Sequence, residues 1–316
     1  MESRNSFEEN TIVCVTGATG MVGQRIVRRL LSDGYVVRVL SRKDTFPDNR
    51  VEHYWGGLED KGVLRSFVSC AHMLFHCAAE LNNEARMWAI NVNGTETLLN
   101  EIKGTSIRYL CYLSSAGVVG KTNLKWVDED TPCDPQNTYE KSKWAAEKLV
   151  AKGIEGCSVV ILRPTDVISE DKPGLLTLPL KSSCMDVLKV FVKGGECAHI
   201  VHADDVADAA LYFSTRHFNS PQCFFVSCDH EPLNTVAGLW ALYKSYTRKC
   251  TDGKVRKMPH LPLIIPYLAR KIWRGTGNRG DVRYSSEKLL SEGFHYRLGV
   301  KETVKILALR NGKNNP

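Results

Sequence analysis

The stretch Thr11-Ile12-Val13-Cys14-Val15-Thr16-Gly17-Ala18-Thr19-Gly20-Met21-Val22-Gly23 decides the fold. An apolar run of strand-forming residues leads into three glycines spaced three apart, and apolar residues with helical spacing follow them. Gly17 suits a backbone conformation closed to other residues, Gly20 lets the chain approach a pyrophosphate, and Gly23 lets a helix lie close to the sheet. The free N–H groups and the dipole at the start of that helix favour an anion. The stretch therefore predicts a strand, a tight turn and a helix that bind a dinucleotide.

Strand-like and helix-like stretches alternate after this point. We expect strands near 11–16, 36–41, 51–55, 72–77, 108–114 and 157–163, and helices near 21–33, 60–69, 87–103 and 138–152. This alternation predicts an α/β fold with a doubly wound parallel sheet (Rossmann type) covered by helices on both faces.

The same patterns predict the division into domains. A dinucleotide-binding Rossmann domain should span residues 8–166, with 200–228 returning to it, and a small C-terminal substrate-covering lobe should comprise 167–199 and 229–312. Later elements are expected as helices at 201–213, 233–246 and 302–309 and a strand at 223–227. Asp204 and Asp205 are expected to cap the helix that follows them.

The composition indicates an ordinary globular protein. Of the 316 residues, 43% are hydrophobic and 24% are charged, and no apolar run reaches the roughly 18 residues of a membrane span. The polar segment Met1–Asn10 has no apolar core of a signal peptide, so we expect a cytoplasmic location. The 11 cysteines fit no zinc spacing, and several, such as Cys14, Cys111 and Cys157, lie in apolar runs. We therefore expect reduced thiols and no metal site.

Positive charge gathers at the C-terminal end. The stretch from Lys244 to Pro316 has 17 Lys and Arg against 5 Asp and Glu, within a net charge of +7 for the whole chain. Such a lobe could face an anionic substrate, a nucleic acid or a membrane surface, or form a solvated face. Nucleic acid is not expected, because the lobe lacks interleaved aromatic residues. The apolar segment 261–272, followed by Trp273 and Arg274, is expected to pack on its own domain or to line an apolar pocket rather than to contact a membrane.

The end of the second expected strand bears on the coenzyme. An acidic residue there bonds the ribose of NAD, whereas arginine suits the 2′-phosphate of NADP. Here the strand ends in Ser41, Arg42 and Lys43 without an acidic residue. We therefore expect NADP, with NAD the less favoured coenzyme. Leu58, within Gly56–Asp60, lies where such folds pass the adenine.

A catalytic constellation is predicted from spacing. Tyr139 and Lys143 stand at i and i+4 in a stretch of good helix formers, which places phenol and ammonium on one helix face. A nearby ammonium favours the phenolate and brings the phenol pKa towards neutral pH, as a proton-transfer catalyst requires. Ser114 and Ser115 end an expected strand, where a parallel sheet presents its ligands. Either serine could orient a substrate oxygen.

With these residues in view, the sequence resembles the extended short-chain dehydrogenase/reductase family, of the NAD-dependent epimerase/dehydratase type. The motifs that carry the resemblance span nearly the whole chain: Thr16–Gly23, His76–Ala79, Asn91–Thr95, Leu113–Gly120, Tyr139–Lys143, Leu162–Pro164, His202–Ala207, Tyr284–Leu289 and Glu292–Phe294.

The resemblance implies a role for each matching residue. Tyr139 would be the general acid/base and would also contact the coenzyme. Lys143 would hold the nicotinamide ribose and tune Tyr139, and Ser115, rather than Ser114, would orient the substrate oxygen. The other coenzyme contacts would come from the glycine turn and from the ends of later strands and helices: Gly17, Thr19, Gly20, Met21, Val22, Gly23, Ser41, Arg42, Lys43, Leu58, Ala78, Ala79, Asn91 and Pro164. His76 and His202 are expected to be structural, and a homodimer seam over 87–103 and 138–152 is expected by analogy.

Three departures from the family pattern bear on the substrate. Gly57 replaces an Asp that often contacts the adenine, and Asp166 replaces an Asn that often serves sugar-nucleotide phosphates. The Ser114-Ser115-Ala116 segment lacks the Thr-Asp-Glu signature of 4,6-dehydratases, so that reaction is not expected.

The sequence thus predicts an NADP(H)-dependent oxidoreductase acting on a secondary alcohol or ketone. A nucleotide sugar, in 4-ketoreduction or 4-epimerisation, is slightly favoured, because Arg270, Arg274, Arg279 and Arg283 could bind a diphosphate. The alternative is an apolar ketone like those of hydroxysteroid and dihydroflavonol reductases, favoured by segment 261–272 and by Asp166. A hypothesis from another class is a non-catalytic NADP-binding sensor or scaffold.

Overall fold

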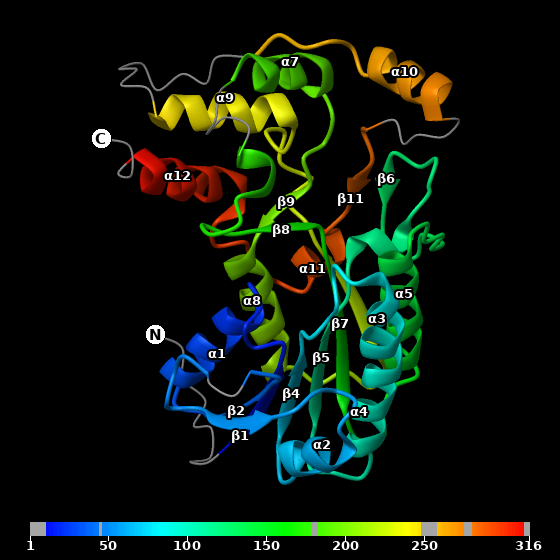
Figure 1. Cartoon of the computed structure of the whole chain (residues 1–316), viewed down its shortest axis with the longest axis vertical. Coiled ribbons are helices and arrows are strands. Elements are labelled where there is room, and N and C mark those ends of the chain that lie inside the picture. The colour runs from blue at the N-terminus through cyan, green and yellow to red at the C-terminus, as the bar shows by residue number, and fades with distance from the viewer. Residues whose placement is uncertain (1–10, 44–45, 178–182, 248–257, 275–279, 313–316) are drawn as a thin grey trace. The chain divides into compact units, whose positions relative to one another are not determined.

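The structure, a computed structural model, describes residues 11–43, 46–177, 183–247, 258–274 and 280–312 (Figure 1). The chain divides into two compact units. Unit 1 comprises Met1–Val118, Pro135–Arg163 and Ala207–Cys223, and unit 2 comprises Val119–Asp134, Pro164–Val206 and Phe224–Pro316.

A seven-stranded sheet has the order β10–β7–β5–β4–β1–β2–β3. Its strands are β1 (Ile12–Thr16), β2 (Val36–Ser41), β3 (Glu52–Trp55), β4 (Met73–His76), β5 (Tyr109–Leu113), β7 (Ser158–Pro164) and β10 (Gln222–Val226). The pairs from β3 across to β7 are parallel. The expected α/β fold with a doubly wound parallel sheet is confirmed.

Helices cover both faces of this sheet. They are α1 (Gly23–Ser32), α2 (Lys61–Val68), α3 (Glu84–Met87), the π segment η1 (Trp88–Asn93), α4 (Gly94–Ile102), α5 (Thr138–Val150) and α8 (Ala203–Tyr212). On one face, Phe67 of α2, Leu98 of α4 and Ala146 of α5 share a buried cluster with Cys14 of β1. Because strand side chains alternate between faces, Val13 and Val15 of β1 point to the opposite face, where α1 packs on β1 and β2.

Unit 2 contains shorter elements. Its strands are β6 (Trp126–Val127), β8 (Asp166–Ile168), β9 (Ile200–His202) and β11 (Arg283–Tyr284), and its helices are α7 (Cys184–Lys193), α9 (Val236–Thr247), α10 (Ile264–Arg274), α11 (Glu287–Ser291) and α12 (Gly299–Gly312). Two small parallel sheets pair β8 with β9 and β6 with β11. Val190 of α7 and Trp240 of α9 pack together in a small core.

The expected helix at 87–103 differs from the structure at its start. The helix begins at Glu84, and its second turn is the π segment η1 before it continues as α4. The π segment brings Asn91 into the interior, where its side chain bonds Glu80 and Ser142. Such π turns are often found at functional sites. The spacing of hydrophobic residues in the sequence does not by itself predict this π segment.

The expected helix at 201–213 and its caps also need correction. Residues 200–202 form β9, because they pair with β8, and the helix begins only at Ala203. His202 accepts the N–H of Asp204 at 3.1 Å and so caps this helix. Asp205 is fully buried and instead accepts the N–H groups of 297, 298 and 299 at 3.0 Å, which caps the start of α12.

The expectation of reduced thiols agrees with the geometry. All 10 cysteines within the described residues are free. No helix in the described parts of the chain is both long and apolar enough to cross a membrane. The homodimer seam stays a prediction.

Candidate active site

The glycine turn between β1 and α1 has one crowded side and one open side. Gly17 has φ +66, and a Cβ there would lie 2.6 Å from the backbone of Cys77 and Ala78. A Cβ on Gly23 would lie 2.3 Å from the carbonyl oxygen of Gly17. Gly20 donates its N–H to Gly17 O at 2.9 Å and is exposed, as is Thr19. Packing thus demands Gly17 and Gly23, whereas Gly20 borders open space.

The start of α1 fits an anionic group. Val22 at its N-cap supplies no side-chain hydrogen bond, and the first turn of the helix holds no acidic residue. The N–H groups at this end are therefore not neutralised by the helix's own side chains. Together with the exposed Gly20 backbone they form a fitting cradle for the pyrophosphate of a dinucleotide.

The contrast between Gly20 and Gly17 yields a prediction. Replacing Gly20 by Ala should weaken coenzyme binding at least tenfold and shift the melting temperature little, because the added Cβ meets only Gly17 O, at 3.1 Å. Replacing Gly17 by Ala should instead destabilise the protein, since a positive φ and a backbone clash must both be accommodated. Thermal unfolding and NADPH titration separate the two effects. Equal loss of stability in both variants would contradict this assignment.

The residues expected at the adenine end lie at the end of β2 and near α2. Arg42 and Lys43 are exposed, and Ser41 Oγ accepts the N–H of Lys43 at 3.1 Å. Leu58 is buried in the core, where it packs against Gly94. Its side chain therefore does not face solvent, and only its backbone is left for the coenzyme contact expected there.

Asn91 ties the end of β4 to the helix that carries Tyr139. Its Nδ2 donates to Ser142 Oγ at 2.9 Å, and its Oδ1 accepts the N–H of Glu80 at 2.7 Å. Ser142 Oγ in turn donates to the backbone oxygen of Tyr139 at 2.8 Å. Ala78 and Ala79, half-buried, lie in the loop just before Glu80. Asn91 is therefore a positioning residue: through these hydrogen bonds it holds both the loop at 78–80 and helix α5.

Ser115, Tyr139 and Lys143 come together in unit 1. A capping box of Asn137 and Glu140 fixes the start of α5, one residue before Tyr139. The Ser115 side chain forms a hydrogen bond with Tyr139, and Lys143 Nζ donates to the backbone oxygen of Leu113 at 2.6 Å. Spacing predicted the shared helix face, and the structure adds that both side chains reach the end of β5.

Burial biases Tyr139 and Lys143 towards their neutral forms. It raises the pKa of Tyr139, which the hydrogen bond from Ser115 partly offsets. It lowers the pKa of Lys143 to about 7, against the opposing charge of Glu147. A phenol that keeps its proton can donate it to a developing alkoxide, which is the task of the acid in ketone reduction.

Ser114 has a different partner from Ser115. It is buried, and its hydroxyl donates to Glu147, which also accepts Arg163 Nη2 at 2.6 Å. The Glu147 and Arg163 side chains are 3% and 5% exposed, so this ion pair is cut off from water. The geometry therefore favours Ser115 over Ser114 as the hydroxyl beside Tyr139. Sequence reasoning missed Glu147, although it continues the i, i+4 series of Tyr139 and Lys143 by one more turn.

Pro164 is the last residue of β7, one residue beyond the expected strand end, and is buried there. His76 lies at the end of β4 with both ring nitrogens satisfied, Nδ1 at 2.7 Å from Thr16 Oγ1 and Nε2 at 2.9 Å from Thr95 Oγ1. Burial lowers the pKa of His76 to about 3, so it stays neutral. The structural role expected for His76 fits these contacts.

His202 in unit 2 lies near two carboxylates, those of Glu170 and Asp204. Its Nδ1 accepts the N–H of Asp204, which leaves the ring proton on Nε2, 3.8 Å from Glu170 Oε1. A protonated nitrogen has no lone pair for a metal ion. This arrangement gives no support to a metal site at His202.

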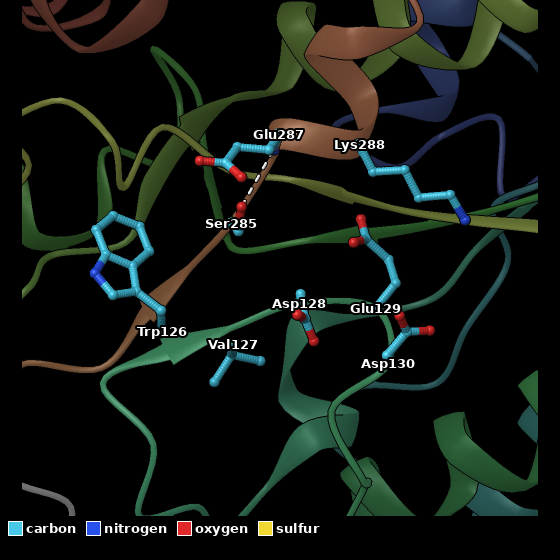
Figure 2. A pocket seen from close by; sticks show the side chains of 8 residues that line it. All are labelled: Trp126, Val127, Asp128, Glu129, Asp130, Ser285, Glu287 and Lys288. Atoms are coloured by element: carbon cyan, nitrogen blue, oxygen red, sulfur yellow. Dashed lines mark hydrogen bonds between the residues drawn. The ribbon is translucent and has the colours of Figure 1, made fainter.

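Unit 2 holds a pocket of about 540 Å³ beside β6 and β11 (Figure 2). Trp126 lies at one end of the pocket and Lys288 at the other. The remaining lining residues include four acidic side chains: Asp128, Glu129, Asp130 and Glu287. An acidic lining of this kind repels phosphate groups.

The glycine turn, the open N-terminus of α1 and the Ser115–Tyr139–Lys143 cluster define a nucleotide-binding Rossmann protein with the residues of a short-chain dehydrogenase. The chain matches the model of the NAD dependent epimerase/dehydratase family over residues 13–224. It belongs to that family, which is of the extended short-chain dehydrogenase/reductase type.

Two of the curated relatives are similar to this chain over part of its length. The 3 beta-hydroxysteroid dehydrogenase/Delta 5→4-isomerase of Mycobacterium tuberculosis is 31% identical over 248 residues, 70% of this chain and 66% of that protein. Sterol demethylase protein B of Methylococcus capsulatus is 28% identical over 196 residues, 57% of this chain and 59% of that protein. The matches span between 47% and 66% of the length of the curated relatives.

Solved structures share the fold. A short-chain dehydrogenase/reductase superfamily protein from Agrobacterium tumefaciens with bound NAD superposes with a TM-score of 0.74 at 20% identity, covering 96% of this chain and 98% of that one. UDP-glucose 4-epimerase from Thermotoga maritima with UDP-glucose gives a TM-score of 0.71 at 20% identity, covering 96% and 100%.

Proposed function

We propose that this chain is an NADP(H)-dependent oxidoreductase that interconverts a ketone and a secondary alcohol on an apolar molecule. The observation that carries the proposal is the hydrogen bond between Ser115 and Tyr139, with Lys143 one helical turn further along α5. The coenzyme, when bound, supplies or accepts hydride at the nicotinamide. Tyr139 would give its proton to the substrate oxygen in reduction and take it back in oxidation, while Ser115 would orient that oxygen.

Lys143 would hold the nicotinamide ribose through its ammonium. The pKa of Lys143 is about 7, so the amine can gain a proton when an anionic or hydroxyl-bearing group binds next to it. A charged Lys143 would in turn favour the phenolate of Tyr139 and so lower the cost of proton transfer. The two groups therefore act as a coupled pair.

The preference for NADP rests on the end of β2. Ser41 occupies the place of the acidic residue that would bond an NAD ribose and repel a 2′-phosphate. The exposed Arg42 and Lys43 follow it and would pair with that phosphate. The coenzyme-bound structural neighbour from Agrobacterium tumefaciens contains NAD. At 20% identity it shows a shared fold but does not decide between NAD and NADP for this chain.

The preference for an apolar substrate reverses the slight lean of the sequence towards a nucleotide sugar. Two of the four arginines that could bind a diphosphate have partners within unit 2: Arg270 pairs with Glu196, and Arg283 bonds the backbone oxygen of Asp229. Arg274 and Arg279 have side chains outside the described residues. The unit 2 pocket is acidic, and the two relatives named above carry sterol and steroid names.

A panel of substrates with both coenzymes tests the proposal. We expect NADPH oxidation with a steroid-like ketone, with kcat/KM at least tenfold higher than with NADH. Arg42→Ala should reduce that preference by about tenfold or more, because a charge-assisted hydrogen bond contributes roughly 1.5–3 kcal/mol. Turnover only of UDP-4-keto sugars would establish the nucleotide-sugar alternative. Coenzyme binding without turnover of either class would establish the sensor or scaffold.

A further inference from the structure

Trp55 is the last residue of β3, the strand at the edge of the seven-stranded sheet. β3 pairs in parallel with β2, and Trp55 lies opposite Ser41, one residue before Arg42. Both strands therefore end at the same edge of the sheet, the edge at which parallel sheets bind their ligands. Trp55 is 68% exposed, so the core does not hold its indole in place.

A hydrogen bond to the backbone of Arg42 holds the indole instead. Trp55 Nε1 donates to the backbone oxygen of Arg42 at 3.2 Å. Next to it, the N–H of Gly56 donates to Ser41 O at 3.0 Å. The end of β3 thus binds the carbonyl groups of two successive residues where β2 ends. Trp55 extends this hold by one residue, onto the residue that carries the guanidinium.

The side chain of Arg42 is available to a ligand. Arg42 is exposed, and its guanidinium pairs with no carboxylate of the residues that the structure describes. The N–H groups of 82 and 83 lower the pKa of Glu80, in the loop after β4, and the charge of Arg42 adds to this effect. β1, which leads into the glycine turn, lies between β2 and β4 in the sheet. The charge of Arg42 therefore acts across the edge at which the coenzyme is expected.

We propose that Trp55 is a positioning residue for the choice of coenzyme: its indole N–H holds the Arg42 backbone so that the guanidinium meets the 2′-phosphate of NADP. This inference rests on the proposed function and deepens its preference for NADP. A long arginine side chain loses conformational freedom when it binds a phosphate, and a backbone that is already fixed reduces the further loss. NAD has no 2′-phosphate, so its binding does not depend on this contact.

Calorimetric titration of NADP⁺ and NAD⁺ into the full chain tests this role without any substrate. Trp55→Phe keeps an aromatic ring and removes the N–H. It should lower the ratio of NADP⁺ to NAD⁺ affinity about three- to tenfold, the effect of one typical hydrogen bond. The affinity for NAD⁺ and the melting temperature should stay near those of the wild type. Trp88→Phe is the matched control, because Trp88 is 51% exposed in the same unit and its indole donates to none of the described residues.

Arg42→Ala in the same titration separates this inference from the proposed function. If the wild type binds both coenzymes equally, or if Arg42→Ala keeps the wild-type ratio, the proposed basis of the NADP preference is wrong and the role of Trp55 falls with it. If Arg42→Ala lowers the ratio and Trp55→Phe does not, only the role of Trp55 is overturned. The same holds if Trp88→Phe lowers the ratio as much as Trp55→Phe does.

The double variant Trp55→Phe with Arg42→Ala tests whether the indole acts through Arg42. Its ratio of NADP⁺ to NAD⁺ affinity should equal that of Arg42→Ala alone, because the backbone hold has no further effect once the guanidinium is gone. A further drop of the ratio in the double variant would overturn the positioning role, since the indole would then contact the coenzyme directly.

Discussion

Replacing Tyr139 by Phe is expected to reduce turnover by about 10²–10⁴-fold, the usual contribution of general acid–base catalysis. Phenylalanine keeps the ring and removes the hydroxyl that bonds Ser115 and would exchange a proton with the substrate oxygen. The glycine turn is untouched, so NADPH affinity should change by less than about threefold. Steady-state kinetics and a fluorescence titration of NADPH measure the two quantities.

A matched control is Tyr54→Phe, which removes a phenol hydroxyl from β3, where the ring packs edge-on against Phe67. It should leave turnover near that of the wild type. If Tyr139→Phe retains most of its activity, or if both variants lose activity alike, Tyr139 is not the proton donor.

The second large effect is expected on stability. Glu147→Leu should lower the free energy of unfolding by about 3–5 kcal/mol, because it leaves the buried guanidinium of Arg163 without its counter-charge. It also removes the acceptor of the Ser114 hydroxyl. Denaturant unfolding in the absence of coenzyme measures the change.

Glu101→Leu serves as the comparison for Glu147→Leu. Glu101 pairs with Arg65, whose side chain is 77% exposed, so the loss should be about 1 kcal/mol or less. The double variant Glu147→Leu with Arg163→Met should recover part of the stability, since no unpaired charge then stays buried. Equal losses in Glu147→Leu and Glu101→Leu would contradict the importance of the buried pair.

The sheet and the reacting side chains could be predicted because they depend on local signals. The three glycines after β1 and the i, i+4 spacing of Tyr139 and Lys143 each act within one turn or one helix. The choice between Ser114 and Ser115 could not be made from spacing alone, because it depends on Glu147, 33 residues away from Ser114.

The errors arose where contacts distant in sequence decide the structure. Asp205 is an acidic residue in the first turn of α8, as a helix cap would be, yet its carboxylate accepts N–H groups more than 90 residues away. The π segment at Trp88–Asn93 likewise serves the contact of Asn91 with Ser142, 51 residues further on.

Direct titration of coenzyme tests the central claim, that a nicotinamide coenzyme binds at the glycine turn of unit 1. NADPH fluorescence should rise saturably with the purified wild-type chain at one site per chain, and Gly20→Ala should shift the midpoint to at least tenfold higher concentration. A response that is absent with both NADPH and NADH, or that Gly20→Ala leaves unchanged, would contradict the claim.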